Sequence, residues 1–424
     1  MSRIEARTLS FIFAAALCLR AGAAILTETH PIFPAFYYTD ARNIELQISQ
    51  ALSAEAEGRP FAFNGTQSQL VQVKTQLALY RLVGPRPLAM KFLNAALGAL
   101  ACAVLAAALL PAFGPAPALA SAALCAAWPS NVFFTSQNLK ESPTNLLAYL
   151  ALWGFSVLLA GKTRRAATVS LVAAGVILAL TAGALYRAYI LLVLTTAMAL
   201  ACALEMGLRR RISAASALYL AAALAALTLY APASRLLRTR WLTAAHAQDR
   251  GLSTQIIPLT WNDRHRPTSP RGLTEFRLFQ LEADRNWARA HRGREIATQL
   301  FPEARFESWL DVAAFLPKGV FYSLFMPLPG LYPLEGKPGR LMAGLENLVL
   351  LTLAALGLQG AWRGPKTSGR ALLLLVFAGM AAGAGLLEPD LGSAARHKLL
   401  YLPMLFPFAA EEIRRTWRRH FILI

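Results

Sequence analysis

The sequence Ser136-Gln137-Asn138-Leu139-Lys140-Glu141-Ser142-Pro143-Thr144 lies between two long apolar runs. A short polar connector of this kind is typical of a membrane protein, because charged groups cost least at the edge of the lipid. One interpretation is a solvated loop in which Lys140 and Glu141 only mark the end of a span. The other is a functional site, since such charges carry function when they face a cavity. A second acidic residue in a similar setting, Asp40, favours the functional interpretation.

The composition of the whole chain indicates a membrane protein. Of its 424 residues, 56% are hydrophobic and 15% are charged, whereas soluble domains carry roughly 25% charged residues. The apolar residues occur in runs of roughly 20, the length of a helix that crosses a bilayer. We therefore predict an all-α polytopic protein of the lipid bilayer with about ten transmembrane helices.

The net charge of +19 reflects membrane topology rather than nucleic-acid binding. Each basic cluster flanks an apolar run, as the positive-inside rule describes for cytoplasmic loops. No basic stretch is interleaved with aromatic residues, as a groove for nucleic acid would be. We expect a multi-pass protein of the inner (plasma) membrane with both termini in the cytoplasm. The clusters are Arg3/Arg7, Lys162/Arg164/Arg165, Arg209/Arg210/Arg211, Arg363/Lys366/Arg370 and Arg414/Arg415/Arg418/Arg419.

The apolar runs divide the chain into three regions. Residues 1–232 are expected to form a transmembrane module with an outer loop at 28–84. Residues 233–312 form a small extracytoplasmic loop domain, and 313–424 hold a re-entrant segment and the C-terminal spans. The expected spans are 9–26, 87–110, 118–134, 144–160, two within 166–208, 213–232, 341–362, 371–387 and 399–410.

Two features of these regions need separate interpretation. In the outer loop, residues 40–57 and 68–83 have helical patterns, and the first carries an apolar stripe suited to the membrane surface. The apolar stretch 313–332 is interrupted by Lys318 and three prolines. A full span there would place the basic cluster at 363–370 outside, so we interpret this stretch as re-entrant or interfacial.

The polar groups that could do chemistry fall on the predicted outer side. A carboxylate there can remove a proton from an acceptor hydroxyl, and lysine or arginine can neutralise a leaving phosphate. We take Asp40 and Glu141 as candidate catalytic residues. The candidates for binding a donor phosphate are Lys74, Lys140, Arg187, Tyr189, Lys318, Arg396 and His397.

Three of these candidates have a plainer alternative. Asp40 precedes a helical pattern and could act only as a helix cap. Lys74 could lie on a solvated helix face, and Arg187 could extend to the membrane surface from a junction between spans. The histidines have no zinc-binding spacing. No cofactor is indicated, and a requirement for a divalent metal stays open.

The order of several short motifs resembles the GT-C superfamily of membrane glycosyltransferases. The closest similarity is to bacterial family 39-type enzymes, which include the protein O-mannosyltransferases and the lipid A aminoarabinose transferases. The similarity covers about residues 8–210 and is looser beyond. The stretches that carry it are Tyr37-Tyr38-Thr39-Asp40-Ala41-Arg42, Leu77-Ala78-Leu79-Tyr80-Arg81-Leu82-Val83-Gly84, Ala89-Met90-Lys91-Phe92-Leu93-Asn94, Trp128-Pro129-Ser130 and Leu139-Lys140-Glu141.

This resemblance implies a GT-C-like bundle and a sugar donor linked to a polyprenyl phosphate at the outer face. Asp40 would be the general base, and Glu141 the second acidic residue of the site. Lys74 falls where some members have a Lys-Pro-Pro-Leu motif, although this chain reads Lys74-Thr75-Gln76-Leu77. The donor sugar and the acceptor, whether lipid, glycan or protein, are not specified.

Two other functions fit the same features. A polymerase or ligase of surface polysaccharide would also use acidic and cationic residues at the outer face. A transporter or flippase of lipid-linked sugars would show inverted repeats and broken helices that meet at the membrane midplane. We find no such repeats in the sequence.

Overall fold

The computed structural model describes residues 3–30, 39–59, 61, 63, 67–159, 166–209, 214–246, 271–272, 274–279, 281–282, 285, 298–333 and 338–421. Within these ranges all regular elements are helices, and the only β contact is an isolated bridge. Eight of the helices are long and apolar enough to cross a membrane, or nine if a bent pair counts as one span. The predicted all-α polytopic class is therefore confirmed. The eight are α1 (Arg3–Thr29), α4 (Pro87–Phe113), α7 (Glu141–Leu159), α8 (Ala166–Tyr186), α9 (Ala188–Arg209), α10 (Ala214–His246), α13 (Pro338–Arg363) and α14 (Ser368–Leu387).

The expected count of ten spans is not reached among the described residues, for a reason that involves proline. Residues 118–134 form two helices, α5 (Pro115–Ala127) and α6 (Pro129–Thr135), which are bent by 63°. Residues 399–410 are divided among α15 (Leu391–Tyr401), the 3-10 turn η3 (Leu402–Met404) and α16 (Phe406–Phe421). Pro129 begins α6 and Pro403 lies in η3. Because proline has no N–H to donate, it ends or kinks a helix at these points.

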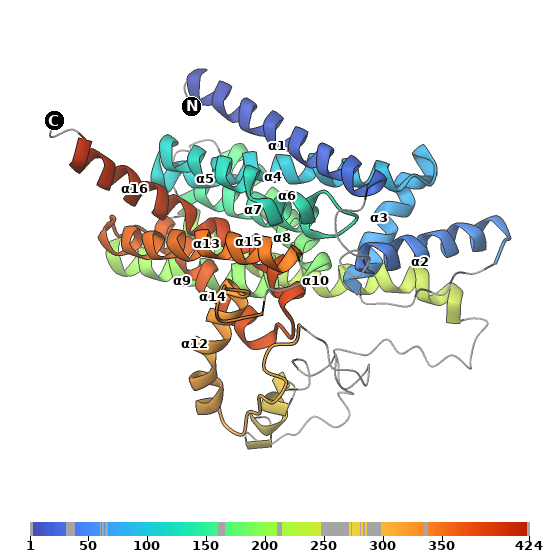
Figure 1. The fold of residues 1–424 in the computed structure, drawn as a ribbon. Coiled ribbons are helices and arrows are strands. Elements are labelled where there is room, and N and C mark those ends of the chain that lie inside the picture. The colour runs from blue at the N-terminus through green and yellow to red at the C-terminus, as the bar shows by residue number, and fades with distance from the viewer. Residues whose placement is uncertain are drawn as a thin grey trace.

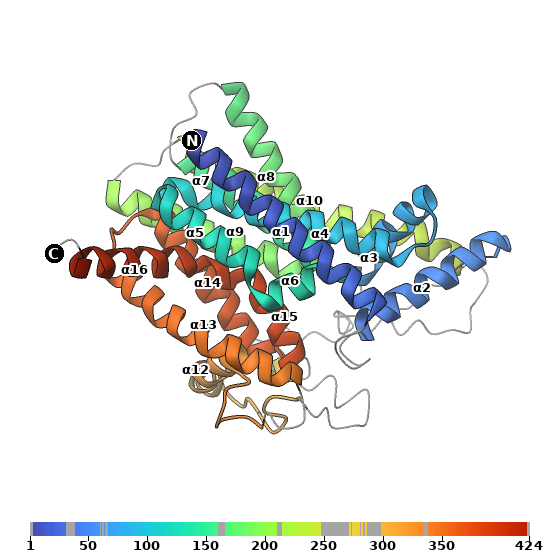
Figure 2. The ribbon, with the colours of Figure 1, turned by 45° about the horizontal axis from the view of Figure 1, so that its top comes forward.

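Both ends of the described chain lie at the same end of the bundle (Figures 1 and 2). Helices α2 (Thr39–Ala56) and α3 (Gln67–Val83) project from the opposite end. Arg363 pairs with Glu412 at 2.7 Å, which holds the α13–α14 turn against α16. This arrangement agrees with both termini on the same side of the membrane. Their cytoplasmic location stays a prediction.

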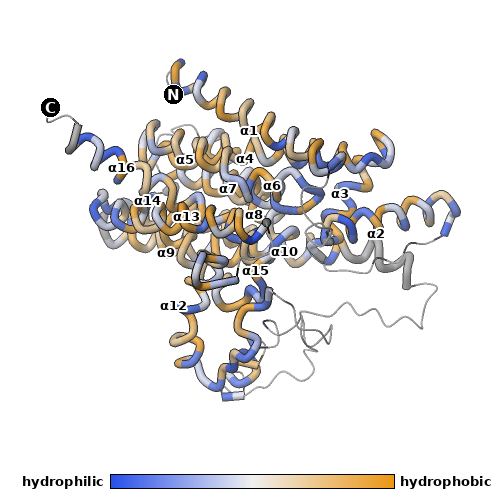
Figure 3. Tube along the Cα trace, viewed as in Figure 1, coloured by the Kyte–Doolittle hydropathy of each residue, from blue (hydrophilic) through white to orange (hydrophobic). Residues whose placement is uncertain are grey.

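The bundle is hydrophobic along its length, as Figure 3 shows by colour, and its core is rich in small residues. Alanines from several helices form much of the main buried cluster, and small residues let membrane helices approach closely. One close approach of this kind joins α14 to α12 (Trp309–Phe325). There, a Cβ atom on Gly385 would lie 2.6 Å from the backbone nitrogen of Val320, so only glycine fits without movement.

Helices α2 and α3 pack on each other. The predicted apolar stripe of α2 exists, but Ile44 and Ile48 are buried in a small cluster with Leu70 and Leu77 of α3. The stripe is therefore covered by protein, and the prediction that it lies on the membrane surface is wrong for these residues. An exposed ion pair of 3.0 Å between Arg81 and Glu55 also joins the two helices.

Two segments of the C-terminal half depart from expectation. Helix α10 continues through Pro232 to His246, beyond the expected end of the first region. Helix α12 continues through Pro317 to Phe325, so the stretch at 313–332 is helical for most of its length. Much of the expected loop domain at 233–312 lies outside the described residues, as do Lys162, Arg164, Arg165, Arg210 and Arg211.

The α12–α14 contact gives a test of the fold. Gly385→Ala should destabilise the protein by about 1–3 kcal/mol, because its methyl group would overlap the backbone of α12. The matched control is Gly383→Ala on the same helix, where a Cβ meets no atom within 4 Å. Thermal unfolding in detergent should show a lower melting temperature for the first variant only. Equal melting temperatures would contradict this packing.

Candidate functional site

The connector that precedes α7 is buried. Ser136, Gln137 and Asn138 are at most 2% exposed. Asn94 of α4 donates hydrogen bonds from Nδ2 to the carbonyl oxygens of Gln137 (2.6 Å) and Leu139 (3.0 Å). These bonds satisfy backbone groups that the irregular connector leaves without helical partners. The interpretation of the connector as a solvated loop is therefore wrong.

A buried ion pair lies at the start of α7. The Arg187 guanidinium donates to Glu141 Oε1 at 2.7 Å, and its other terminal nitrogen donates to the hydroxyl of Tyr189 at 2.9 Å. Arg187 sits at the break between α8 and α9, and its side chain is 5% exposed. The plainer interpretation, in which Arg187 extends to the membrane surface, is therefore wrong. Glu141 Oε2 and Arg187 Nε have no hydrogen-bond partner among the described residues.

A second and more exposed ion pair joins two distant parts of the chain. Arg396 of α15 donates to Asp40 Oδ2 of α2 at 2.5 Å. The Asp40 side chain is 51% exposed and that of Arg396 is 22% exposed. Asp40 lies within the first turn of α2, where a negative charge also interacts favourably with the helix dipole. Its position is thus explained by Arg396 as well as by the helix.

His397, the next residue on α15, pairs with a carboxylate that sequence reasoning did not select as a site residue. Its Nδ1 contacts Glu388 Oε1, which lies just before α15. Burial and the charge of Arg187 lower the pKa of His397 below its ordinary 6.5. Burial acts to raise the pKa of Glu388, but the charge of His397 and its hydrogen bond lower it to about 2. At neutral pH, these shifts favour a neutral imidazole beside an ionised carboxylate.

Lys140 lies at the rim of the same cluster. Its ammonium group donates to Ser68 Oγ of α3 at 2.8 Å. Burial, together with the charge of Arg187, lowers the pKa of Lys140 to about 7. The group is therefore protonated in only part of the molecules at neutral pH, and a bound anion would favour its charged form.

Several of these residues line one small pocket between α7, α15 and the break that separates α8 from α9. Its lining includes both members of the ion pair, two neighbouring residues of α15 and uncharged groups from α7. Asp40 reaches the pocket through Arg396, and Glu388 reaches it through His397. The pocket is a place where a bound anion would meet several cations and a bound hydroxyl would meet a carboxylate. The lining residues are Glu141, Thr144, Asn145, Arg187, Arg396, His397 and Leu400.

A polar network fixes α2 and α3 to the connector. Glu45 of α2 accepts hydrogen bonds from Tyr80 of α3 (2.9 Å) and from Asn138 (2.6 Å). Burial raises the pKa of Glu45, although these hydrogen bonds act against the rise. Because Asp40 lies on the same helix as Glu45, the network also helps to hold Asp40 near the pocket.

Two of the predicted site residues lie elsewhere. Lys74 of α3 donates to the backbone carbonyl of Leu237 in α10 at 2.9 Å. The ammonium of Lys318 in α12 lies 4.2 Å from the ring centroid of Phe301, a cation–π distance. Neither lysine lines the pocket. The other predicted residues, Asp40, Lys140, Glu141, Arg187, Tyr189, Arg396 and His397, are brought together.

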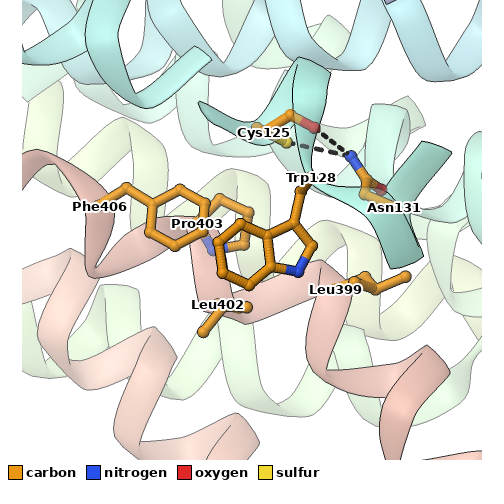
Figure 4. A pocket seen from close by; sticks show the side chains of 7 residues that line it. All are labelled: Cys125, Trp128, Asn131, Leu399, Leu402, Pro403 and Phe406. Carbon is orange, nitrogen blue, oxygen red and sulfur yellow. Dashed lines mark hydrogen bonds between the residues drawn. The ribbon is translucent and has the colours of Figure 1, made fainter. Parts of the chain in front are cut away.

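A second pocket lies farther along α15 and is lined mostly by apolar groups, as Figure 4 shows. Leu399 borders it and is three residues, or about one helical turn, beyond Arg396. The indole Nε1 of Trp128 has no hydrogen-bond partner among the described residues. Since the lining has no charged side chain, this pocket offers less for acid–base chemistry than the first. The remaining lining residues are Cys125, Asn131, Leu402, Pro403 and Phe406.

The described ranges contain no group of three or more histidine, cysteine, aspartate or glutamate side chains arranged to hold a metal ion.

Sequence comparison does not assign this chain to a family: no protein-family model matches it, and no curated protein matches it significantly.

The buried ion pair can be tested by a double-mutant cycle. Glu141→Gln and Arg187→Gln should each destabilise the protein by about 3–5 kcal/mol, because each leaves a buried charge unpaired. The double variant should lose less than the sum of the two, with a coupling of about 0.5–3 kcal/mol. Chemical or thermal unfolding in detergent measures the three differences. Strict additivity would contradict a direct pair.

The altered basicity of Lys140 gives a second test. Competitive acylation measured by mass spectrometry should give a titration midpoint near pH 7 for the Lys140 amine. The reference compound in the same tube, Nα-acetyl-lysine amide, should titrate at about pH 10.4. Arg187→Met should raise the midpoint of Lys140, because the Arg187 charge is one cause of the lowered pKa. A midpoint above about pH 9.5 in the wild type would contradict this environment.

Proposed function

We propose that the protein transfers a sugar from a polyprenyl-phosphate-linked donor to an acceptor hydroxyl at the outer face of the membrane. The observation that carries this proposal is the Asp40–Arg396 pair at the edge of the pocket. It joins an accessible carboxylate to a cation that also lines the pocket. A hydroxyl acceptor needs such a base, and a leaving phosphate needs such a cation.

The exposure of the two acidic residues favours different roles for them. Asp40 is half-exposed and lies within reach of solvent, whereas Glu141 is 3% exposed and bound to Arg187. A general base must come within hydrogen-bond reach of the proton that it removes. We therefore assign Asp40 as the base and Glu141 as the residue that holds Arg187 in position.

The donor phosphate would compete with Asp40 for Arg396. A phosphodiester carries one negative charge and can replace the carboxylate on the guanidinium, because arginine binds both groups with the same donors. Lys140 supplies further positive charge when an anion favours its protonated form. In this way, donor binding would free Asp40 to accept a proton from the acceptor.

In the reaction, the acceptor oxygen forms a bond with the anomeric carbon as the bond from that carbon to the phosphate oxygen breaks. The acceptor proton goes to Asp40, and polyprenyl phosphate leaves with the electron pair. The setting suits an amphiphilic donor, because the polar cluster adjoins a bundle of apolar helices that can face lipid. A charged head group and an apolar chain would each find a matching environment there.

Substitution of Asp40 tests this proposal. With purified protein and a panel of lipid-phosphate sugars, Asp40→Asn should lower turnover by about 10²–10⁴-fold, because the amide cannot accept the proton. Asp40→Ala should lower turnover similarly. The matched control is Glu55→Gln, which removes another exposed carboxylate of α2 that pairs with an arginine, Arg81 of α3.

The control should transfer sugar at close to the wild-type rate, and Asp40→Asn should melt within a few degrees of the wild type. Transfer by Asp40→Asn at the wild-type rate would assign Asp40 a structural role only. Transfer from lipid-pyrophosphate sugars alone would instead favour a polysaccharide polymerase or ligase.

A further inference from the structure

The pair formed by His397 and Glu388 has no part in the mechanism described so far, although it borders the same pocket. His397 lines the pocket with Glu141, Arg187 and Arg396. Its Nδ1 is engaged by Glu388, whose side chain is 10% exposed. A carboxylate in this position fixes the imidazole with Nδ1 protonated, which leaves Nε2 as the nitrogen available to other groups.

We propose that His397 is the general acid for the leaving phosphate, and that Glu388 positions its ring and stabilises its charged form. This inference rests on the proposed function. It gives the reaction two titratable groups in different surroundings, with the half-exposed Asp40 as base and the less exposed His397 as acid. Two titratable groups whose surroundings push their pKa values apart often divide the roles of acid and base between them.

The charges around His397 explain when it would carry a proton. His397 faces Arg187 at the break between α8 and α9, Tyr189 of α9 and Arg396 of its own helix, with Lys140 and Glu141 nearby. Burial and these cations disfavour the imidazolium, and Glu388 favours it. A phosphodiester bound at Arg396 would add a negative charge next to the ring, and an adjacent anion favours the protonated form. Donor binding would thus be coupled to proton uptake by His397.

The proton balance of the reaction then closes. The bond between the anomeric carbon and the phosphate oxygen breaks, and that oxygen takes the proton from Nε2 of His397. The acceptor proton goes to the Asp40 carboxylate. The products are the glycosylated acceptor and a polyprenyl phosphate that carries one proton. Loss of a proton from Asp40 to water and uptake of one by His397 with the next donor restore the starting state.

The experiment follows the protonation of His397 directly. The full chain, with its six histidines labelled with ¹³C and ¹⁵N, is studied in detergent micelles by NMR at several pH values. The His397 signal is identified by its absence from His397→Gln. The probe is the methyl diester of a polyprenyl phosphate, which has no titration of its own near neutral pH and carries no sugar to transfer.

Without the probe, the ring of His397 should be neutral at pH 7, with Nδ1 protonated. At saturation, its titration midpoint should rise by about one pH unit or more, and Glu388→Gln should reduce that rise. An unchanged midpoint at saturation, or failure of the diester to bind, would overturn the proposal. If His397→Gln does not fold, His397→Asn identifies the signal instead.

A kinetic readout separates this inference from the proposed function. In His397→Gln, a donor with a more acidic leaving group should recover much of the lost rate, since such a group needs no proton. The same donor should not rescue Asp40→Asn. If the wild type transfers sugar but His397→Gln loses rate equally with both donors, the acid role is rejected. The proposed function would still stand in that case. Absence of transfer by the wild type would reject the proposed function itself.

Discussion

The buried ion pair between Glu141 and Arg187 is the interaction on which the arrangement of the site depends. Each side chain is at most 5% exposed, and the removal of two charges from water costs more than a single contact returns unless further hydrogen bonds support it. Tyr189 supplies one such bond to Arg187. The pair joins the start of α7 to the break between α8 and α9, so it fixes the connector against the helix junction. The pocket with its charged lining lies where those two breaks meet.

The second ion pair differs from the first in exposure, and that difference separates structure from function. Asp40 and Arg396 are both partly accessible to solvent, so their mutual attraction is weaker, and an anion could compete with Asp40 for Arg396. The inner pair can remain intact while the outer pair opens. In our proposal, the inner pair keeps the pocket preformed, and the outer pair exchanges a carboxylate for a donor phosphate.

The local hydrophobic pattern predicted the helices better than it predicted the breaks between them. The helices at 40–57 and 68–83 were predictable from the spacing of Ile44 and Ile48 and from similar periodicity. The bend after Trp128 and the break at Pro403 were not, because an apolar run looks the same whether a proline kinks it or two helices divide it. The burial of the α2 stripe under α3 also depends on tertiary packing, which a stripe alone does not reveal.

The site was predictable as a set of residues but not as a set of partners. Polar residues at the ends of apolar runs indicated Asp40, Glu141, Arg187 and Arg396. Their pairing joins residues as far apart as 40 and 396, and no local spacing contains that information. Lys74 and Lys318 had the same local signal, yet they contact a backbone carbonyl and an aromatic ring instead.

Glu388 was missed as a site residue because an acidic group after a span is ordinary. Glu388 and His397 both fall in the turn expected between the spans 371–387 and 399–410, and their separation of nine residues indicates no contact by itself. Partner identity is therefore the information that needed the three-dimensional structure.

The central claim is that the outer ion pair opens for a phosphate while the inner pair stays closed. A cryo-electron microscopy structure in nanodiscs, with the methyl diester of a polyprenyl phosphate bound, tests it most directly. The account predicts phosphate density on Arg396, with Asp40 released and the contact between Glu141 and Arg187 unchanged. Phosphate density away from this pocket, or an intact contact between Asp40 and Arg396 in the bound state, would contradict it.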